Sequence, residues 1–344
     1  MKCNLPFISH RNRQHVSLCF VVLLFAGRRS AGPVARAAAA LRLVQLGAQD
    51  VMPPHEAHPA ALARAVRLAV ERKRLERAAR KMQDSGTRLL WGTANLFSHP
   101  RYMSGAATNP DPAVRREAID LTKRGIDAAR AMGAPMMTLW LGQDGWDYAF
   151  QCDYPALWAD EISGIAEVAA HDPDCMISIE YKPNEPRSYA VLPDAATTLL
   201  AIAEVGLPNL GVTIDFAHAL YADEQPAFAA MLVQSRSRLL GLHLNDGYAK
   251  RDDGLMVGAV HDQATLELLR AVHRGGFDGA IYFDTFPDHG GTDPVGEARA
   301  NIAVTDRLRA IARSLAGNAD LAKAQAAQDA AAATRIVLAA LYGA

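Results

Sequence analysis

The sequence has little of what disulfide-rich, fibrous or nucleic-acid-binding proteins depend on. Its four cysteines are widely scattered among 344 residues and form no CxxC pair, which excludes a disulfide framework and a thiolate zinc site and favours a reducing compartment. The 36 basic and 37 acidic residues leave a net charge of -1, so no overall positive field attracts nucleic acid or an acidic membrane. The 25 glycines and 18 prolines follow no period, which excludes a collagen-like repeat.

What the sequence does contain is typical of a globular protein. Hydrophobic residues make up 50% of the chain and charged residues 21%, which excludes a disordered chain. The length suits one large barrel or two smaller domains with a sizeable core.

The first 32 residues allow two interpretations. Basic residues precede an apolar run at residues 16–27, and small residues follow it, which is the pattern of a secretory signal peptide. The run is too short for a membrane span. A short run rich in Val and Phe is equally typical of a buried strand, so both interpretations stay open on this segment alone.

From residue 88 onward, short apolar segments alternate with amphipathic stretches. The predicted helices cover about residues 111–133, 193–205, 225–237, 262–274 and 294–315. Repeated strand–helix units at about 35-residue spacing require parallel strands joined by right-handed crossovers. The predicted strands are residues 88–95, 136–141, 176–181, 210–215, 239–245 and 279–284.

The positions of the polar residues favour a closed barrel over an open sheet. Most of these segments end in a charged or metal-binding group, and Asn95 leads to His99. In a barrel the C-terminal strand ends converge on one mouth, and no GxGxxG follows a strand to indicate a dinucleotide site. We therefore predict an α/β protein with a (β/α)8 TIM barrel at residues 88–316 and a helical tail at 317–344. The irregular region 1–87 would hold the first two barrel strands, at about residues 16–25 and 41–51, and a basic helix at 59–82. The tail is apolar and is expected to pack against the barrel or a neighbouring subunit.

The candidate chemistry lies at the strand ends. Oxygen-rich ligands with two imidazoles and no thiolate suit Mg²⁺, Mn²⁺ or Co²⁺, and carboxylates gathered at one mouth would repel unless one or two cations separate them. Taken singly, a strand-end Asp is also a common helix cap. Lys182 lies two residues after Glu180 and faces the same way, as a proton handler or as an ion-pair partner of Glu180 or Glu185. The candidate set is Glu180, Asp215, His218, His243, Asp252, Asp253 and Asp284.

Several blocks together resemble the xylose isomerases. The most specific is IEYKPNEP at residues 179–186, and the others are TANLFSHP (93–100), GAATN (105–109), LWLGQDG (139–145), DFAH (215–218), HLND (243–246), DDGLMVG (252–258) and YFDTFP (282–287). The resemblance covers about residues 88–315. It implies a TIM barrel, two divalent metal ions (Mn²⁺, Mg²⁺ or Co²⁺), a small sugar substrate and aldose–ketose isomerisation by a metal-assisted hydride shift.

The resemblance also implies a role for each matching residue. Lys182 would be catalytic and would stabilise a sugar oxygen near the carbonyl carbon. The pocket residues would be Trp140, Phe97 and Thr93, although a strand Trp also commonly fills a barrel core. The first metal would be held by Glu180, Asp215, His243 and Asp284, with Asp215 bridging to a second metal held by His218 and Asp252.

The sequence departs from the family pattern at several points. Xylose isomerases carry Glu at Asp215 and Asp at His243, so the ligand types are closer to the rhamnose-isomerase-like branch, and the last ligand of the second metal is missing or moved to Asp253. The family's ring-opening histidine has no counterpart in residues 46–53, and His55 and His58 lie outside its motif. Because the family pattern starts abruptly, we hypothesise that residues 1–87 are frame-shifted or misassigned and that the signal-like run is spurious, which predicts a cytoplasmic protein.

Two other functions remain open at this point. One is a metal-dependent phosphodiesterase or endonuclease with the same barrel and metal cluster. The other is a metal-binding barrel without turnover, which the missing histidine would explain. We expect a sugar as the partner, no nucleic acid or membrane, and a homo-oligomer, either a dimer or a tetramer.

Overall fold

The computed structural model describes residues 22–24, 50–52, 77, 80–82, 84–287 and 291–343. The chain divides into two compact units, Met1–Thr87 and Arg88–Ala344. In the first unit, β1 (Val22–Leu24) and β2 (Asp50–Met52) pair in parallel. Most of the predicted helix 59–82, together with His55 and His58, lies outside the described residues. The assignment of this unit to the first two barrel strands stays a prediction.

The second unit is built on six parallel strands that lie side by side in the order of the sequence. This arrangement confirms the predicted alternation of strands and helices, because each strand pairs in parallel with the next one along the chain. The strands are β3 (Trp91–Thr93), β4 (Met136–Leu139), β6 (Met176–Glu180), β8 (Leu210–Asp215), β9 (Leu239–Leu244) and β10 (Ala280–Phe283).

The sheet curves like the wall of a barrel. Its two edge strands, β3 and β10, meet through their side chains: the ring centroids of Trp91 and Tyr282 lie 5.3 Å apart. Trp91 also stacks on His243 of β9, at 5.6 Å between ring centroids. A flat sheet would hold strands at opposite edges several strand spacings apart, so these contacts require strong curvature.

A one-residue irregularity in β9 sets the register of the two central strands. Val212 pairs with Leu239, whereas the next residue, Thr213, pairs with Gly241, so Leu240 is an extra residue on β9. A Cβ at Gly241 would lie 2.6 Å from the Thr213 hydroxyl oxygen, so only glycine allows this approach. The shift places Asp215 opposite His243; without it Asp215 would face the preceding residue.

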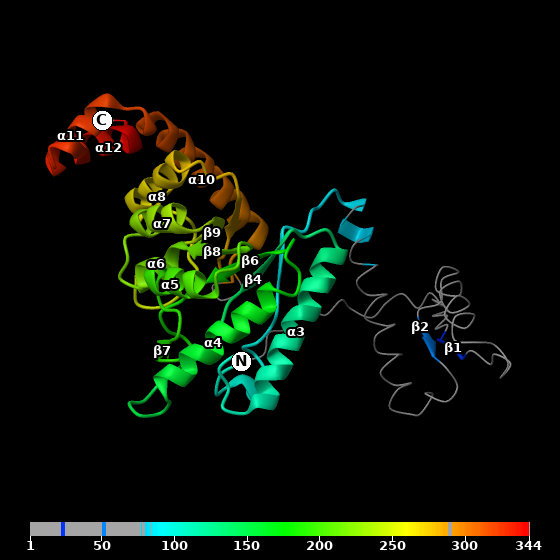
Figure 1. The fold of residues 1–344 in the computed structure, drawn as a ribbon. Coiled ribbons are helices and arrows are strands. Elements are labelled where there is room, and N and C mark those ends of the chain that lie inside the picture. Colours follow the sequence, from blue (N-terminus) through cyan, green and yellow to red (C-terminus); the bar gives the residue numbers. More distant parts are fainter. Residues whose placement is uncertain are drawn as a thin grey trace. The chain divides into compact units, whose positions relative to one another are not determined.

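Helices follow the strands and cover the outer face of the sheet. Figure 1 shows α5 to α8 gathered beside β6, β8 and β9. Side-chain caps start several of them; for example, Asp111 accepts a hydrogen bond from Ala113 N at the start of α3, as its position before Pro112 predicts. The helices are α3 (Pro112–Ala131), α4 (Tyr154–Ala169), α5 (Ala195–Val205), α6 (Phe216–Tyr221), α7 (Pro226–Arg236), α8 (Asp262–Arg274) and α10 (Pro294–Ala316), with a short 3-10 turn at Pro100–Tyr102.

Two of these helices, α4 and the short α6, were not among those that the sequence predicts. In α4, Asp153 stands at the N-cap position and Pro155 lies in the first turn, but Asp153 makes no side-chain cap bond. The loops after β4 and β6 also form a small antiparallel ribbon of β5 (Gly145–Trp146) and β7 (Tyr189–Ala190).

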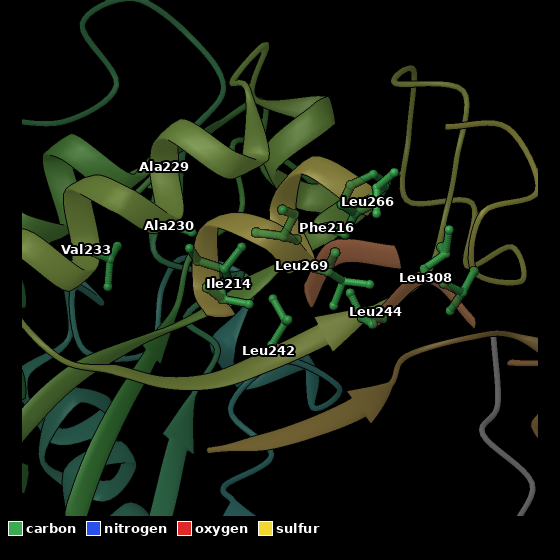
Figure 2. Packing of buried hydrophobic residues seen from close by; sticks show 14 of the residues in the cluster. Ile214, Phe216, Ala229, Ala230, Val233, Leu242, Leu244, Leu266, Leu269 and Leu308 are labelled. Carbon is green, nitrogen blue, oxygen red and sulfur yellow. The ribbon is translucent and has the colours of Figure 1, made fainter. Parts of the chain in front are cut away.

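The core lies between the sheet and its helices. Every residue of β8 is buried, as expected of a central parallel strand covered on both faces. Figure 2 shows Ile214 and Leu242 packing toward Val233 and Leu269, with Phe216 beside them. Burying side chains of this size stabilises the fold by about 1.5–3 kcal/mol each, so this cluster fixes the strands whose ends carry the candidate site.

The predicted helical tail is confirmed as two helices, α11 (Ala319–Ala326) and α12 (Ala330–Tyr342), which Figure 1 shows beyond the end of α10. Leu321 of α11 is buried in the main core cluster, and Ile336 and Val337 of α12 pack against it. The Tyr342 hydroxyl donates to Asp262 Oδ2 of α8 over 2.5 Å. The tail therefore packs against the barrel, which was one of the two arrangements expected from the sequence. Within the described residues, no helix has both the length and the apolar character needed to cross a membrane.

Two fully buried acids, Glu161 of α4 and Asp144 of the loop after β4, lie close enough to influence each other's charge. Asp144 Oδ1 accepts hydrogen bonds from Ala106 N, Thr108 N and the Thr108 hydroxyl. Both carboxylate oxygens of Glu161 and Oδ2 of Asp144 have no partner. Burial, and then the charge of Asp144, raises the pKa of Glu161 well above its ordinary value of 4.5, so the folded protein holds a proton there.

We expect Glu161→Gln to stabilise the protein at pH 8. Because the pKa of Glu161 is raised by folding, its stability contribution is fully present below pH 4.5 and is lost as the pH rises toward the folded-state value. The neutral amide removes this loss, and the free energy of unfolding at pH 8 should rise by about 1–3 kcal/mol. Denaturant unfolding at pH 5 and pH 8 measures it.

Glu167→Gln on the same helix is the control. Hydrogen bonds from Arg116 and Lys123 lower the pKa of Glu167 to about 2, so this carboxylate contributes stability above its unfolded pKa that is lost only as the pH falls toward 2. The control should lower stability at pH 8 slightly, by under about 1 kcal/mol for such an exposed pair. Equal effects of both variants would contradict a special role for Glu161.

Candidate metal centre

Four side chains from four strands meet at the C-terminal end of the sheet. Glu180 ends β6, Asp215 ends β8, His243 lies near the end of β9, and Asp284 follows β10. One potential ligand atom of each lies within 4.8 Å of all the others. Parallel strands bring their C-terminal ends to one edge, so residues spread over about a hundred positions form one group, as the sequence predicts.

His243 is at the centre of this group. Its Nδ1 lies 3.3 Å from Glu180 Oε1 and 3.9 Å from an oxygen of both Asp215 and Asp284. His243 is directly opposite Asp215 across β8 and β9, and opposite Tyr282 across β9 and β10. Nδ1 is buried and makes no hydrogen bond of good geometry, although three carboxylates surround it.

The Asp215 carboxylate is held by neighbours on both sides. Its Oδ1 accepts from His218 N at 3.0 Å, which also starts α6. Asn245 Nδ2 lies 3.1 Å from both Asp215 oxygens, and Asn245 Oδ1 accepts from Ala217 N at 2.9 Å. Asp215 is therefore both a helix cap and a member of the cluster, so the two interpretations of a strand-end Asp both apply to it.

A second group lies beside the first. His218 Nε2 lies 3.2 Å from Asp252 Oδ2, and Lys182 Nζ lies 3.1 Å from the same oxygen. Lys182 also pairs with Glu185 at 3.2 Å, which is one of the ion pairs that the sequence allows. His218 Nδ1 donates to the carbonyl oxygen of Tyr181 at 3.1 Å, so Nε2 is the nitrogen that faces the carboxylate.

The pKa values of these groups reflect the negative charge of the carboxylates gathered around them. Burial, then the nearby charges of Asp215 and Glu180, raises the pKa of Asp284 to about 7. Burial alone would lower the pKa of His218, but Asp215, Asp252 and Glu180 together raise it to about 9. Each shift brings a proton to the site, which is the response expected of carboxylates that lack a compensating cation.

The residues fit a divalent cation. Three carboxylates and an imidazole form a hard, mixed oxygen and nitrogen donor set. The buried orphan atom of the first group is His243 Nδ1, and that of the second group is Asp252 Oδ1. Buried polar atoms are normally satisfied, so each orphan indicates a position for a positively charged partner.

The three predicted pocket residues differ in their surroundings. Phe97 and Trp140 touch edge to face, with ring centroids 4.4 Å apart, and Lys182 Nζ lies 5.5 Å from the Trp140 ring. A Cβ at Gly142 would lie 2.5 Å from Trp140 Cζ2, so the glycine makes room for the indole. Thr93 is exposed at the end of β3.

Two other polar residues near the strand ends are engaged elsewhere. Asp253, the candidate replacement ligand, accepts from Tyr248 N through Oδ2 and pairs with Arg251 through Oδ1. Both of its oxygens are therefore used within their own loop, unlike those of Asp252. His99, which follows β3, is exposed and caps a short turn through Arg101 N.

The sequence analysis missed three residues of the site. Trp91 and Tyr282 form an aromatic wall against His243, with Tyr282 at 4.7 Å between ring centroids. Asn245 anchors Asp215. The position of Asn245 two residues after His243 could have indicated that both side chains face the site, since residues i and i+2 of a strand face the same side. The contact of Trp91 with His243 depends on the curvature of the sheet, and no pattern in the sequence indicates it.

Comparisons with known proteins bear on the family and the fold of this chain. The sequence profile of the xylose isomerase-like TIM barrel family matches residues 40–308. A xylose isomerase of Dinoroseobacter shibae is 32% identical over 249 residues, which are 68% of this chain and 57% of that protein. One from Rhizobium johnstonii is 38% identical over 150 residues, or 42% of this chain and 34% of that protein. The matches thus span between about a third and little more than half of the length of these relatives.

Among solved structures, an L-ribulose 3-epimerase matches with a TM-score of 0.57 and 16% identity, over 70% of this chain and 82% of that one. A D-tagatose 3-epimerase-like protein matches with a TM-score of 0.55 and 17% identity, over 68% and 84%. At such identities the likeness shows the fold alone. Since the family profile covers well over half of the sequence, the chain belongs to the xylose isomerase-like TIM barrel family.

Proposed function

We propose that this chain is a divalent-metal-dependent sugar isomerase that interconverts an aldose and a ketose. The observation that carries the proposal is the cluster of Glu180, Asp215, His243 and Asp284, one from each of four strands, with ligand atoms within 4.8 Å. The 32% identity to a xylose isomerase supports the reaction class. The match spans 57% of the length of that relative.

The four clustered residues would hold the first metal ion, and His218 with Asp252 would hold the second. The orphan atoms His243 Nδ1 and Asp252 Oδ1 support this division. Bound there, Mn²⁺, Mg²⁺ or Co²⁺ would supply Lewis-acid polarisation of sugar oxygens.

The proposed reaction is balanced within one substrate. In the direction from aldose to ketose, a hydrogen moves with its electron pair from C2 to C1 of the open-chain sugar. The C2 hydroxyl loses its proton and becomes the new carbonyl, and the former carbonyl oxygen on C1 gains a proton. Lys182 carries an ammonium group at the site, held by Asp252 and Glu185, and would donate a hydrogen bond to the oxygen near the carbonyl carbon. Trp140 and Phe97 form an apolar side of the pocket that would exclude water, and Thr93 is the remaining proposed substrate contact.

The charge of the site favours a sugar over a phosphodiester. Four carboxylates and one ammonium group, Lys182, surround the candidate metal positions, and that ammonium is already paired with two acids. A nucleic-acid backbone needs several basic contacts, whereas a neutral sugar is not repelled by acidic ligands.

We predict that the protein binds Mn²⁺ and that Glu180→Gln abolishes this binding at the first position. Removing one carboxylate should weaken affinity by more than the about 100-fold typical of losing an outer-shell partner. Isothermal titration with Mn²⁺ measures it. Glu117→Gln, at an exposed position on α3, is the control and should bind like the original chain. Unchanged affinity of Glu180→Gln would remove Glu180 from the site.

We expect the Mn²⁺-loaded protein to convert at least one aldose to its ketose. The assay incubates the protein with D-xylose, D-glucose and L-rhamnose and follows ketose formation by NMR, with bis(p-nitrophenyl) phosphate as a parallel substrate. Hydrolysis of the phosphodiester without ketose would favour the phosphodiesterase. No product from any substrate, with Mn²⁺ demonstrably bound, would favour the barrel without turnover.

Lys182→Gln should lower kcat by about 10²–10⁴ while Mn²⁺ still binds, because the glutamine keeps a hydrogen-bonding group but carries no charge or mobile proton. Lys123→Gln is the matched control, since Lys123 pairs with Glu167 on the outer helices. A kcat for Lys182→Gln equal to that of the control would contradict the catalytic role.

A further inference from the structure

Asn245 is a buried amide whose side-chain hydrogen bonds all go to Asp215 or to α6, the helix that starts directly after Asp215. It is 0% exposed. Its Nδ2 lies 3.1 Å from both oxygens of Asp215, and its Oδ1 accepts from Ala217 N at 2.9 Å.

The chemistry of its partners fixes the orientation of this amide. The Ala217 N–H can only donate, so it must face the amide oxygen. An ionised Asp215 carboxylate can only accept, so it must face the NH₂ group. Turning the amide over would set donor against donor and acceptor against acceptor, so Asn245 has one orientation.

We propose, on the basis of the proposed function, that Asn245 is a positioning residue that holds the Asp215 carboxylate in the orientation needed to bind the metal. Asp215 is 1% exposed, and its only other hydrogen bond among those described comes from His218 N to Oδ1. Among the described residues, Asn245 makes the one hydrogen bond to Oδ2, the oxygen that lies 3.9 Å from His243 Nδ1. Without it, the Oδ2 side of the carboxylate is free to rotate away from the cluster.

The end of β9 carries both a candidate metal ligand and the residue that orients a second ligand. β9 supplies the ligand candidate His243, and two residues later Asn245 reaches across to the neighbouring β8. Partners of this kind restrict ligand orientation and raise ligand basicity, and losing one typically weakens metal affinity by about 10- to 100-fold.

The strand that ends in Asp215, β8, offers a matched control at its opposite end. Asn209 precedes β8 and is 3% exposed. Its Nδ2 donates to the carbonyl oxygens of Ala169, Asp172 and Cys175. Asn209 is therefore as buried and as well bonded as Asn245, but it lies at the end of β8 away from Asp215.

The experiment compares the full chain with Asn245→Ala and Asn209→Ala by isothermal titration with Mn²⁺ and by thermal unfolding without metal. Both variants should lower the unfolding temperature. Asn245→Ala alone should weaken Mn²⁺ affinity, by about 10- to 100-fold, and its ketose-forming activity should return when Mn²⁺ is raised. Asn245→Ser, which keeps a polar atom at this position, replaces Asn245→Ala if the alanine variant does not fold.

The outcomes separate this proposal from the proposed function. If the original chain binds Mn²⁺ and the Asn245 variants bind it equally well, the positioning role is wrong and the metal centre stands. If Asn209→Ala loses as much affinity as Asn245→Ala, the effect is general destabilisation and the role is also wrong. If the original chain binds no Mn²⁺, the proposed function fails, and the role of Asn245 fails with it.

Discussion

The repulsion among the carboxylates gathered at the end of the sheet is the constraint on which the rest of this site depends. Glu180, Asp215 and Asp284 are brought within one cluster by strands whose packing is fixed elsewhere. The core between β8, β9 and their helices holds these strand ends in place, so the acids cannot separate to relieve the repulsion. Protons respond instead: the pKa of Asp284 rises to about 7 and that of His218 to about 9. A divalent cation relieves the same repulsion more completely, because it satisfies several carboxylates at once.

The surrounding residues share the work of orienting these acids. Asn245 and the start of α6 fix Asp215, while Trp91 stacks on His243 and the tilted ring of Tyr282 packs against it. Lys182 and His218 share one oxygen of Asp252. A second pair of buried acids, Asp144 of the loop after β4 and Glu161 of α4, has only some of its oxygens hydrogen-bonded. Buried acids are therefore gathered in both places. Of the two groups, the one at the strand ends also contains an imidazole and has ligand atoms that converge on one point.

Much of the fold was predictable because its signals are local. The six strands are short apolar runs, and Asp111 with Pro112 marks the start of α3 as expected. The helix α4 was not predicted, although Asp153 at its N-cap position and Pro155 in its first turn are start signals of the same kind as Asp111 and Pro112. At the site, residue type and position at a strand end were sufficient to nominate the four clustered residues. They were insufficient to separate Asp252 from Asp253, whose different partners depend on how one loop turns.

The sequence by itself determined the alternation of strands and helices, the chemical types of the candidate ligands and their place at strand ends, because each of these is a property of a few neighbouring residues. Tertiary structure alone decided which of them meet. The extra residue in β9 places His243 opposite Asp215, and the curvature of the sheet brings Trp91 of β3 to the far edge. Register and curvature arise from contacts between strands that are distant in the chain, and no short stretch of sequence contains them.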